Sequence, residues 1–271
     1  ELQKAVEFSD YLVLCVPVKV LHQVLPQVQR YCHQPKVMII ASKGLYQGKP
    51  VSSLIKKTMT KKSIKGIVAL SGPSFANVTI NKNITAVVSA SRSKRLAVEV
   101  QLLFSGPYFR VYTSKDIEGV EYAAALKNVL ALAAGLIDGA GAGQNARAAL
   151  IARGINEILR LKKISSIKQE TLMGLAGIGD IVLTCTDQQS RNYRFGYLLG
   201  QGKKPEEAYR LIQTTVEGTN TLQEVYQLAA KNQLEMPIVQ ALYNVIYLDL
   251  PMKEELKKLM LRELKEEFPT T

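Results

Sequence analysis

The stretch of sequence that decides the fold is KVMIIASKGL, which covers residues 36–45. Its first six residues are nearly all apolar, and a short run of this kind is typical of a strand buried on both faces of a sheet. The next residues, Ser42, Lys43 and Gly44, are small or polar and end the strand in a turn. In open parallel sheets, ligands bind beyond the carboxyl ends of the strands. We therefore expect Lys43 to lie near a ligand.

Strands and helices alternate on both sides of this stretch. Short apolar runs predict further strands at residues 11–16, 66–70, 84–89 and 109–113, and helical spacing predicts helices at 18–31, 51–59 and 92–104. This alternation is typical of βαβ units and a mostly parallel sheet. After Ser114 the strand patterns stop. Helices are predicted at 116–136 and 145–161 and from six later starting points, Ser165, Asn192, Pro205, Glu217, Pro237 and Met252. We predict a Rossmann-like α/β domain in residues 1–114 and an all-α domain in 115–271.

The composition excludes several classes of protein. The 271 residues are 47% hydrophobic and 21% charged, which suits packed cores rather than disorder. No run of about 18 uncharged apolar residues occurs, so we expect no membrane insertion, and the first residues do not read as a signal peptide. Three widely spaced cysteines and two histidines indicate a reducing, cytoplasmic setting and no metal site. The net charge of +12 comes from scattered lysines, which we read as solubilising, and no nucleic-acid binding is expected.

A second polar turn follows the predicted strand at 66–70. It reads SGPSFA, in which Gly72 and Pro73 make a tight turn and Ser74 stands at the expected start of a helix. Hydroxyl and backbone N–H groups in that place can bind an anion, although a serine there can equally be a simple helix cap. Two such turns at adjacent strand ends favour a binding site.

Lys127 is the strongest catalytic candidate, because the helix around it is apolar on nearly all sides. Such a helix is buried, and burial lowers the pKa of a lysine toward the range useful for proton transfer. Asp180 follows the glycine-rich turn GLAGIG, and Thr184 lies one helical turn further on if that segment is helical. Taken alone, Asp180 could also be an ordinary cap.

Two later segments carry groups suited to binding a phosphate. Ser190 is predicted to cap a helix whose first turn holds Arg191 and Asn192, and exposed N–H groups beside a guanidinium make a good anion site. Glu217 opens another helix in the sequence VEG, where a carboxylate favours the helix dipole whatever its function.

Together, the segments SKGL, SGPSFA, ALKNV, GLAGIGDIVLTC, SRN and VEG resemble, in this order, the bacterial-type NAD(P)-dependent glycerol-3-phosphate dehydrogenases. The resemblance implies interconversion of sn-glycerol 3-phosphate and dihydroxyacetone phosphate by hydride exchange with NAD or NADP. It also implies a homodimer that makes glycerol phosphate for phospholipid synthesis. Six motifs in one order are far more specific than any one of them.

The resemblance assigns a role to each candidate residue. Lys127 would be the catalytic proton-transfer group, and Lys43 would contact both substrate and cofactor. The remaining substrate contacts would be Gly72, Ser74, Asp180, Ser190, Arg191 and Asn192. The remaining cofactor contacts would be Ala76, Arg191 and Glu217.

One expected element is missing from the sequence. Dinucleotide-binding domains usually contain a G-x-G-x-x-G turn after their first strand, and no such turn occurs in these residues. A molecule without it would be a non-catalytic remnant that still binds a phosphorylated metabolite. We favour the alternative, in which the first βαβ unit was omitted from the sequence, because the site residues are all retained.

Overall fold

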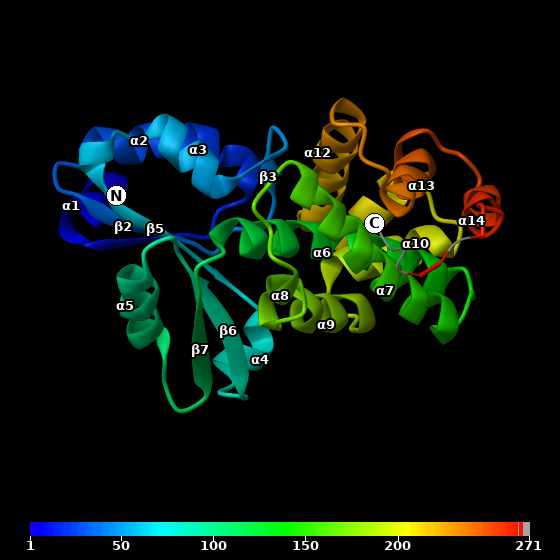
Figure 1. Cartoon of the computed structure of the whole chain (residues 1–271), viewed down its shortest axis with the longest axis horizontal. Helices are drawn as coiled ribbons and strands as arrows, with labels where there is room; N and C mark the ends of the chain where they lie inside the picture. The colour runs from blue at the N-terminus through cyan, green and yellow to red at the C-terminus, as the bar shows by residue number, and fades with distance from the viewer. Residues whose placement is uncertain (265, 268–271) are drawn as a thin grey trace.

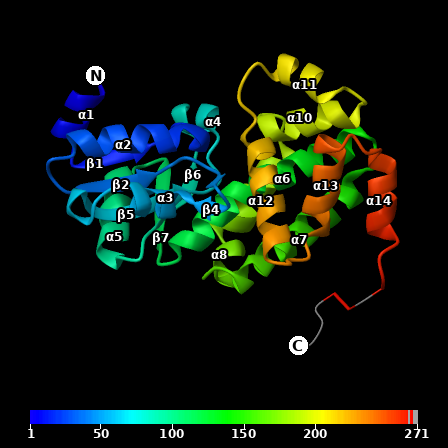
Figure 2. The same ribbon diagram turned by 90° about the horizontal axis from the view of Figure 1, so that it is seen from above.

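A computed structural model describes residues 1–264, 266 and 267 of the chain. It divides into a sheet-containing half and a helical half that lie side by side (Figures 1 and 2). In the described part of the chain, the main sheet has the strand order β1-β2-β5-β6-β7. These strands are β1 (Tyr11–Leu14), β2 (Lys36–Ile40), β5 (Ile64–Ser71), β6 (Thr85–Ala90) and β7 (Phe109–Ser114). All neighbours are parallel except β5 and β6, which pair antiparallel.

Helices cover both faces of this sheet. One face packs against α1 (Leu2–Phe8), α2 (Leu21–Tyr31) and α3 (Val51–Thr58), and the other packs against α5 (Lys94–Phe104). Strand β2 is buried along its whole length because both faces are covered, which explains its unbroken apolar sequence. The carboxyl ends of β1, β2 and β5 point toward the helical half.

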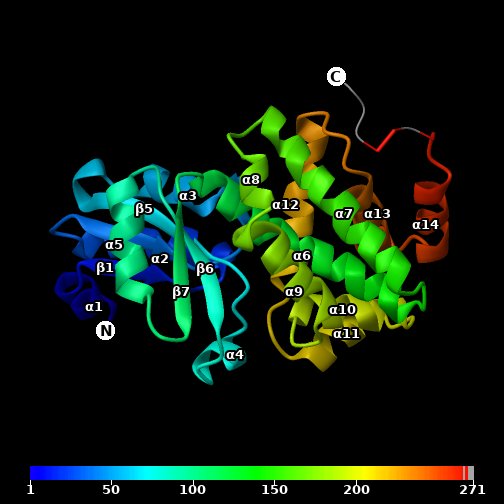
Figure 3. The same ribbon diagram turned by 60° about the horizontal axis from the view of Figure 1, so that its bottom comes forward.

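The helical half is built around α6 (Ile117–Gly139), which Figure 3 shows at its centre. Around it lie α7 (Gln144–Arg160), α8 (Gln169–Leu172), α9 (Asp180–Thr186), α10 (Arg191–Gly200), α11 (Pro205–Ile212), α12 (Glu217–Lys231), α13 (Pro237–Tyr247) and α14 (Met252–Met260). By length and composition α6 could cross a membrane, a feature that was not predicted from the sequence. Its apolar window is, however, 100% buried within the protein, so α6 is a core helix.

The predicted order of strands and helices is confirmed, with ends displaced by a few residues. The helix predicted at 18–31 begins as a 3-10 turn (Val18–Val20), and the helix expected from Ser165 is replaced by the short α8 and a π-helical turn (Leu175–Gly179). The elements that were not predicted include a hairpin of β3 (Leu45–Tyr46) with β4 (Lys49–Pro50) and the short helix α4 (Ala76–Ile80). These segments are too short to show a hydrophobic period.

Candidate active site

Two buried side chains from different helices meet where the sheet edge faces the helical half. Nζ of Lys127, on α6, donates a hydrogen bond to Oδ1 of Asp180, the first residue of α9. The exposed fractions are 4% for Lys127 and 1% for Asp180. Because α9 is helical from Asp180 onward, Thr184 lies one turn away and its hydroxyl donates to the Asp180 carbonyl at 2.6 Å.

Lys43 joins this pair from the sheet side. It lies three residues beyond the end of β2, and its Nζ lies 3.6 Å from Oδ2 of Asp180. That carboxylate oxygen is buried and has no hydrogen-bond partner within the described residues, so it can accept a hydrogen bond from a bound hydroxyl group. Asp180 therefore stands between two lysines, one from each half of the protein.

The surroundings of Lys127 disfavour its charged form. Burial is the main cause, the nearby Lys43 ammonium adds to it, and Asp180 acts in the opposite direction. Together these effects lower the pKa of Lys127 to about 7. A lysine with a pKa in this range can both give and take a proton near neutral pH.

Glu217 and Arg191 complete the charged cluster. Burial raises the pKa of the Glu217 carboxyl, against the attraction of Arg191 and the two lysines that face it. A cavity of about 180 Å³ lies beside Lys43 and Glu217, between the ends of β1 and β2 and helix α12. It is placed where parallel sheets hold their ligands.

The SGPSFA turn reaches the same region through Pro73. The Pro73 ring lies 3.8 Å from the position that a Cβ on Gly179 would take, immediately before Asp180. Ser74 does not cap the following helix, contrary to one reading of the sequence, because its hydroxyl donates to the Gly72 carbonyl at 3.0 Å and Phe75 is the N-cap. Ala76 is exposed at the first residue of α4.

The first turn of α10 brings the third group of predicted residues to the cluster. Ser190 caps α10 as predicted, since its Oγ accepts a hydrogen bond from the Tyr193 N–H at 3.2 Å. Oδ1 of the buried Asn192 accepts from the Gly218 N–H at 2.8 Å, which ties α10 to the start of α12. Arg191 remains exposed beside them.

Two further residues belong to this region. Asn128, the neighbour of Lys127, is only 5% exposed, and Thr184 supports Asp180. Neither was assigned to the site from the sequence, although their position on the buried helix faces was the available signal.

The protein combines a dinucleotide-type sheet with a helical half and a buried lysine–carboxylate pair between them. These are features expected of a nicotinamide-dependent oxidoreductase. Comparison with known proteins makes this specific. Residues 1–97 match the family described as NAD-dependent glycerol-3-phosphate dehydrogenase N-terminus, and residues 116–257 match the C-terminus of the same family. The chain belongs to the NAD-dependent glycerol-3-phosphate dehydrogenase family.

Similar proteins support this assignment. The chain is 40% identical to glycerol-3-phosphate dehydrogenase [NAD(P)+] of Staphylococcus epidermidis over 98% of its own length and 81% of the relative's. It is 42% identical to the Enterococcus faecalis enzyme, over 98% and 79% of the two chains. The crystal structure of glycerol-3-phosphate dehydrogenase from Coxiella burnetii superposes with a TM-score of 0.90 at 36% identity, over 97% of this chain and 80% of that one.

Proposed function

We propose that this protein interconverts sn-glycerol 3-phosphate and dihydroxyacetone phosphate, using NAD or NADP. The observation that carries this proposal is the buried contact of Lys127 with Asp180, approached by Lys43, in a chain of this family. The relatives named for this activity favour catalysis over the alternative of a non-catalytic phosphate-binding remnant.

Lys127 transfers the proton of the reaction. In reduction of the ketone, its ammonium donates a proton to the C2 oxygen, and in oxidation the neutral amine removes the proton from the C2 hydroxyl. Asp180 holds the Lys127 side chain in place through its hydrogen bond and can accept a substrate hydroxyl at Oδ2. Both residues are buried, which limits the access of water to the proton-transfer step.

The phosphate group binds at the start of α10. The N–H groups of the first turn carry partial positive charge, and the Arg191 guanidinium offers a forked pair of donors to phosphate oxygens. Ser190 and Asn192 shape this end of the helix through their hydrogen bonds. Gly72 and Ser74 contact the substrate from the sheet side.

The nicotinamide end of the cofactor fits the carboxyl edge of β1 and β2. The small cavity next to Lys43 and Glu217 lies at this edge. By the family resemblance, Ala76 and Arg191 also contact the cofactor. When bound, the reduced nicotinamide supplies the hydride for C2. The 271 residues contain no G-x-G-x-x-G turn for the pyrophosphate. The proposed cofactor contacts therefore concern its nicotinamide end, next to the reacting atoms.

The wider setting follows from the same proposal. Residues 1–114 act as the cofactor domain and 115–271 as the catalytic helical domain, which also joins two copies into a homodimer. The enzyme works in the cytoplasm, where it makes glycerol phosphate for phospholipids. Sedimentation of the purified protein tests the dimer, and a monomer at micromolar concentration would contradict it.

The test of the activity is loss of reduced-nicotinamide absorbance when the protein meets dihydroxyacetone phosphate, with NADH and NADPH in turn. Turnover with either cofactor supports the proposal and gives the cofactor preference. Binding of glycerol 3-phosphate without any effect of either cofactor would instead support the non-catalytic alternative.

A further inference from the structure

The hairpin that follows Lys43 is an unusual part of the sheet half. Within the residues that the structure describes, strands β3 and β4 pair only with each other, and their turn has positive φ angles at Gln47 (51°) and Gly48 (70°). This is the backbone geometry of a tight two-residue hairpin turn. The chain thus leaves the active site at Lys43, reverses at Gly48 and returns to α3.

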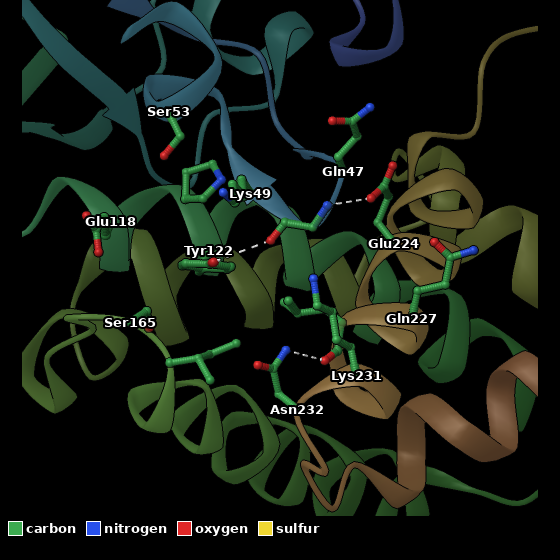
Figure 4. A pocket seen from close by; sticks show the side chains of 14 residues that line it. Gln47, Lys49, Ser53, Glu118, Tyr122, Ser165, Glu224, Gln227, Lys231 and Asn232 are labelled. Carbon is green, nitrogen blue, oxygen red and sulfur yellow. Dashed lines mark hydrogen bonds between the residues drawn. The ribbon is translucent and has the colours of Figure 1, made fainter. Parts of the chain in front are cut away.

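The helical half holds the tip of this hairpin. Oε2 of Glu224, on α12, accepts a hydrogen bond from the Gly48 N–H at 2.5 Å, and the Tyr122 hydroxyl, on α6, lies 3.5 Å from the Gly48 carbonyl oxygen. Figure 4 shows both contacts converging on the turn. At the base of the hairpin, Leu45 packs into the hydrophobic core of the helical half.

Among the described residues, the polar contacts of the tip are these two hydrogen bonds. The tip borders a groove of about 590 Å³ between the hairpin, α6 and α12, and the Leu228 side chain of α12 lies against Gly48 on that side. Gln47 and Lys49, which flank Gly48, are both exposed. Of the two hydrogen bonds at the tip, the one to Glu224 is the shorter and has a charged acceptor, which makes it the stronger.

We propose that Glu224 is a positioning residue for Lys43: by fixing the hairpin tip to α12, it sets where the Lys43 ammonium stands relative to Asp180. This inference rests on the proposed function of Lys43 and goes beyond it. Glu224 does not belong to the cluster of Lys127, Asp180 and Arg191, although it also borders the cavity beside Lys43. It acts on Lys43 through the backbone of residues 44–48. The coupling runs between segments 176 positions apart in sequence.

Displacement of Lys43 would change the pKa of Lys127. The charged groups that face Lys127 are Asp180 from α9, Lys43 from the sheet edge and Glu217 from α12. Lys43 lowers the pKa of Lys127, so moving Lys43 away raises that pKa. Loss of the negative charge of Glu224 would by itself lower the pKa of Lys127. The direction of the pKa change therefore separates movement of Lys43 from the loss of that charge.

The test compares Glu224→Ala with Glu224→Gln and with Gln227→Ala, measuring reduction of dihydroxyacetone phosphate across pH. Gln227 lies on the same helix and lines the same groove, but it makes no hydrogen bond to the hairpin in the described structure, so it is the matched control. We expect Glu224→Ala to lower kcat/KM by about 10- to 100-fold, mainly through KM, and to move the alkaline limb of the profile upward. Glu224→Gln keeps an acceptor for the Gly48 N–H and should restore most of the activity.

Hydrogen–deuterium exchange of the peptide containing residues 43–50 provides a readout that does not depend on turnover. Glu224→Ala should exchange faster there, whereas Gln227→Ala and wild type should match. If wild type is active and Glu224→Ala has the same pH profile and the same exchange as wild type, the positioning role is overturned while the proposed function stands. A wild type without turnover would contradict the proposed function, and the exchange comparison would then decide whether Glu224 holds the hairpin.

Discussion

The substitution Lys127→Met tests the proposed chemistry most directly. Methionine has a similar length and flexibility, so it fills the packed space on α6 while removing only the titrating amine. General acid–base catalysis typically contributes 10²- to 10⁴-fold, so kcat for ketone reduction should fall by about that factor, or about 3–5 kcal/mol in activation free energy. The residual rate would come from positioning of the substrate by the other residues.

The cost of this substitution to stability can be bounded from the structure. Removing one partner of a buried ion pair costs about 3–5 kcal/mol when the other charge is left uncompensated. Asp180 retains the Lys43 ammonium at 3.6 Å and the Thr184 hydroxyl at 3.4 Å, so it is not left alone. We expect a loss below about 3 kcal/mol, which leaves a folded protein with a lower Tm.

The assay pairs steady-state turnover with thermal unfolding and uses Lys36→Met as the matched control. Lys36 is also buried, at 3% exposed, but it lies at the start of β2 and its Nζ contacts the Glu7 carbonyl at 3.4 Å. The control should lose stability and keep its kcat. A Lys127→Met protein whose kcat stayed within threefold of wild type would refute the role given to Lys127.

Three further predictions follow from the site. Because the protonated form of Lys127 donates the proton, ketone reduction should slow as pH rises above about 7, while alcohol oxidation accelerates. Removing the Lys43 charge by Lys43→Met should move both transitions to higher pH. Rate profiles measured against pH in the two directions would show both effects. Arg191→Lys should raise KM for dihydroxyacetone phosphate about 10- to 100-fold with a smaller change in kcat, because the forked contact is lost; equal KM values would count against the phosphate contact. Gly72→Ala should lower the free energy of unfolding, measured by urea titration, by about 1–3 kcal/mol. The new Cβ would lie 2.8 Å from the Val87 Cα, on a residue whose φ is 152°. An unchanged urea midpoint would contradict that crowding.

Much of the fold could be predicted because its signals are local. The apolar run before Ser42 and the apolar surroundings of Lys127 are properties of a few neighbouring residues, and burial follows from them directly. The order of strands and helices was accordingly correct, as was the cap at Ser190. Ser74 shows the limit of this reasoning, because a serine before a helix can cap it or turn back to a nearby carbonyl, and the sequence is the same in both cases.

Contacts between distant segments were not predictable in this way. The hydrogen bond between Glu224 and Gly48 depends on how α12 lies against a turn far away in sequence. Neither residue belongs to a sequence pattern that predicts this contact. The antiparallel pairing of β5 with β6 was likewise hidden, since a buried strand looks the same in either direction. The family resemblance supplied the expected grouping of Lys43 with Asp180, and the structure supplies its distance.

The charges of the site explain why its substrate should be a phosphate ester rather than a neutral alcohol. Lys43, Lys127 and Arg191 oppose Asp180 and Glu217, so the cluster carries one net positive charge whenever Lys127 is protonated. Burial of the Lys127 amine is the main reason that its pKa is low, and the Lys43 ammonium lowers it further. A bound phosphate dianion would offset the net positive charge and raise the pKa of Lys127, so that the ammonium needed for ketone reduction is favoured once the substrate is in place. The alkaline limb for kcat should therefore lie at higher pH than the limb for kcat/KM, because the first reports the complex and the second the free enzyme. Coincident limbs would show that the phosphate binds too far from Lys127 to influence it.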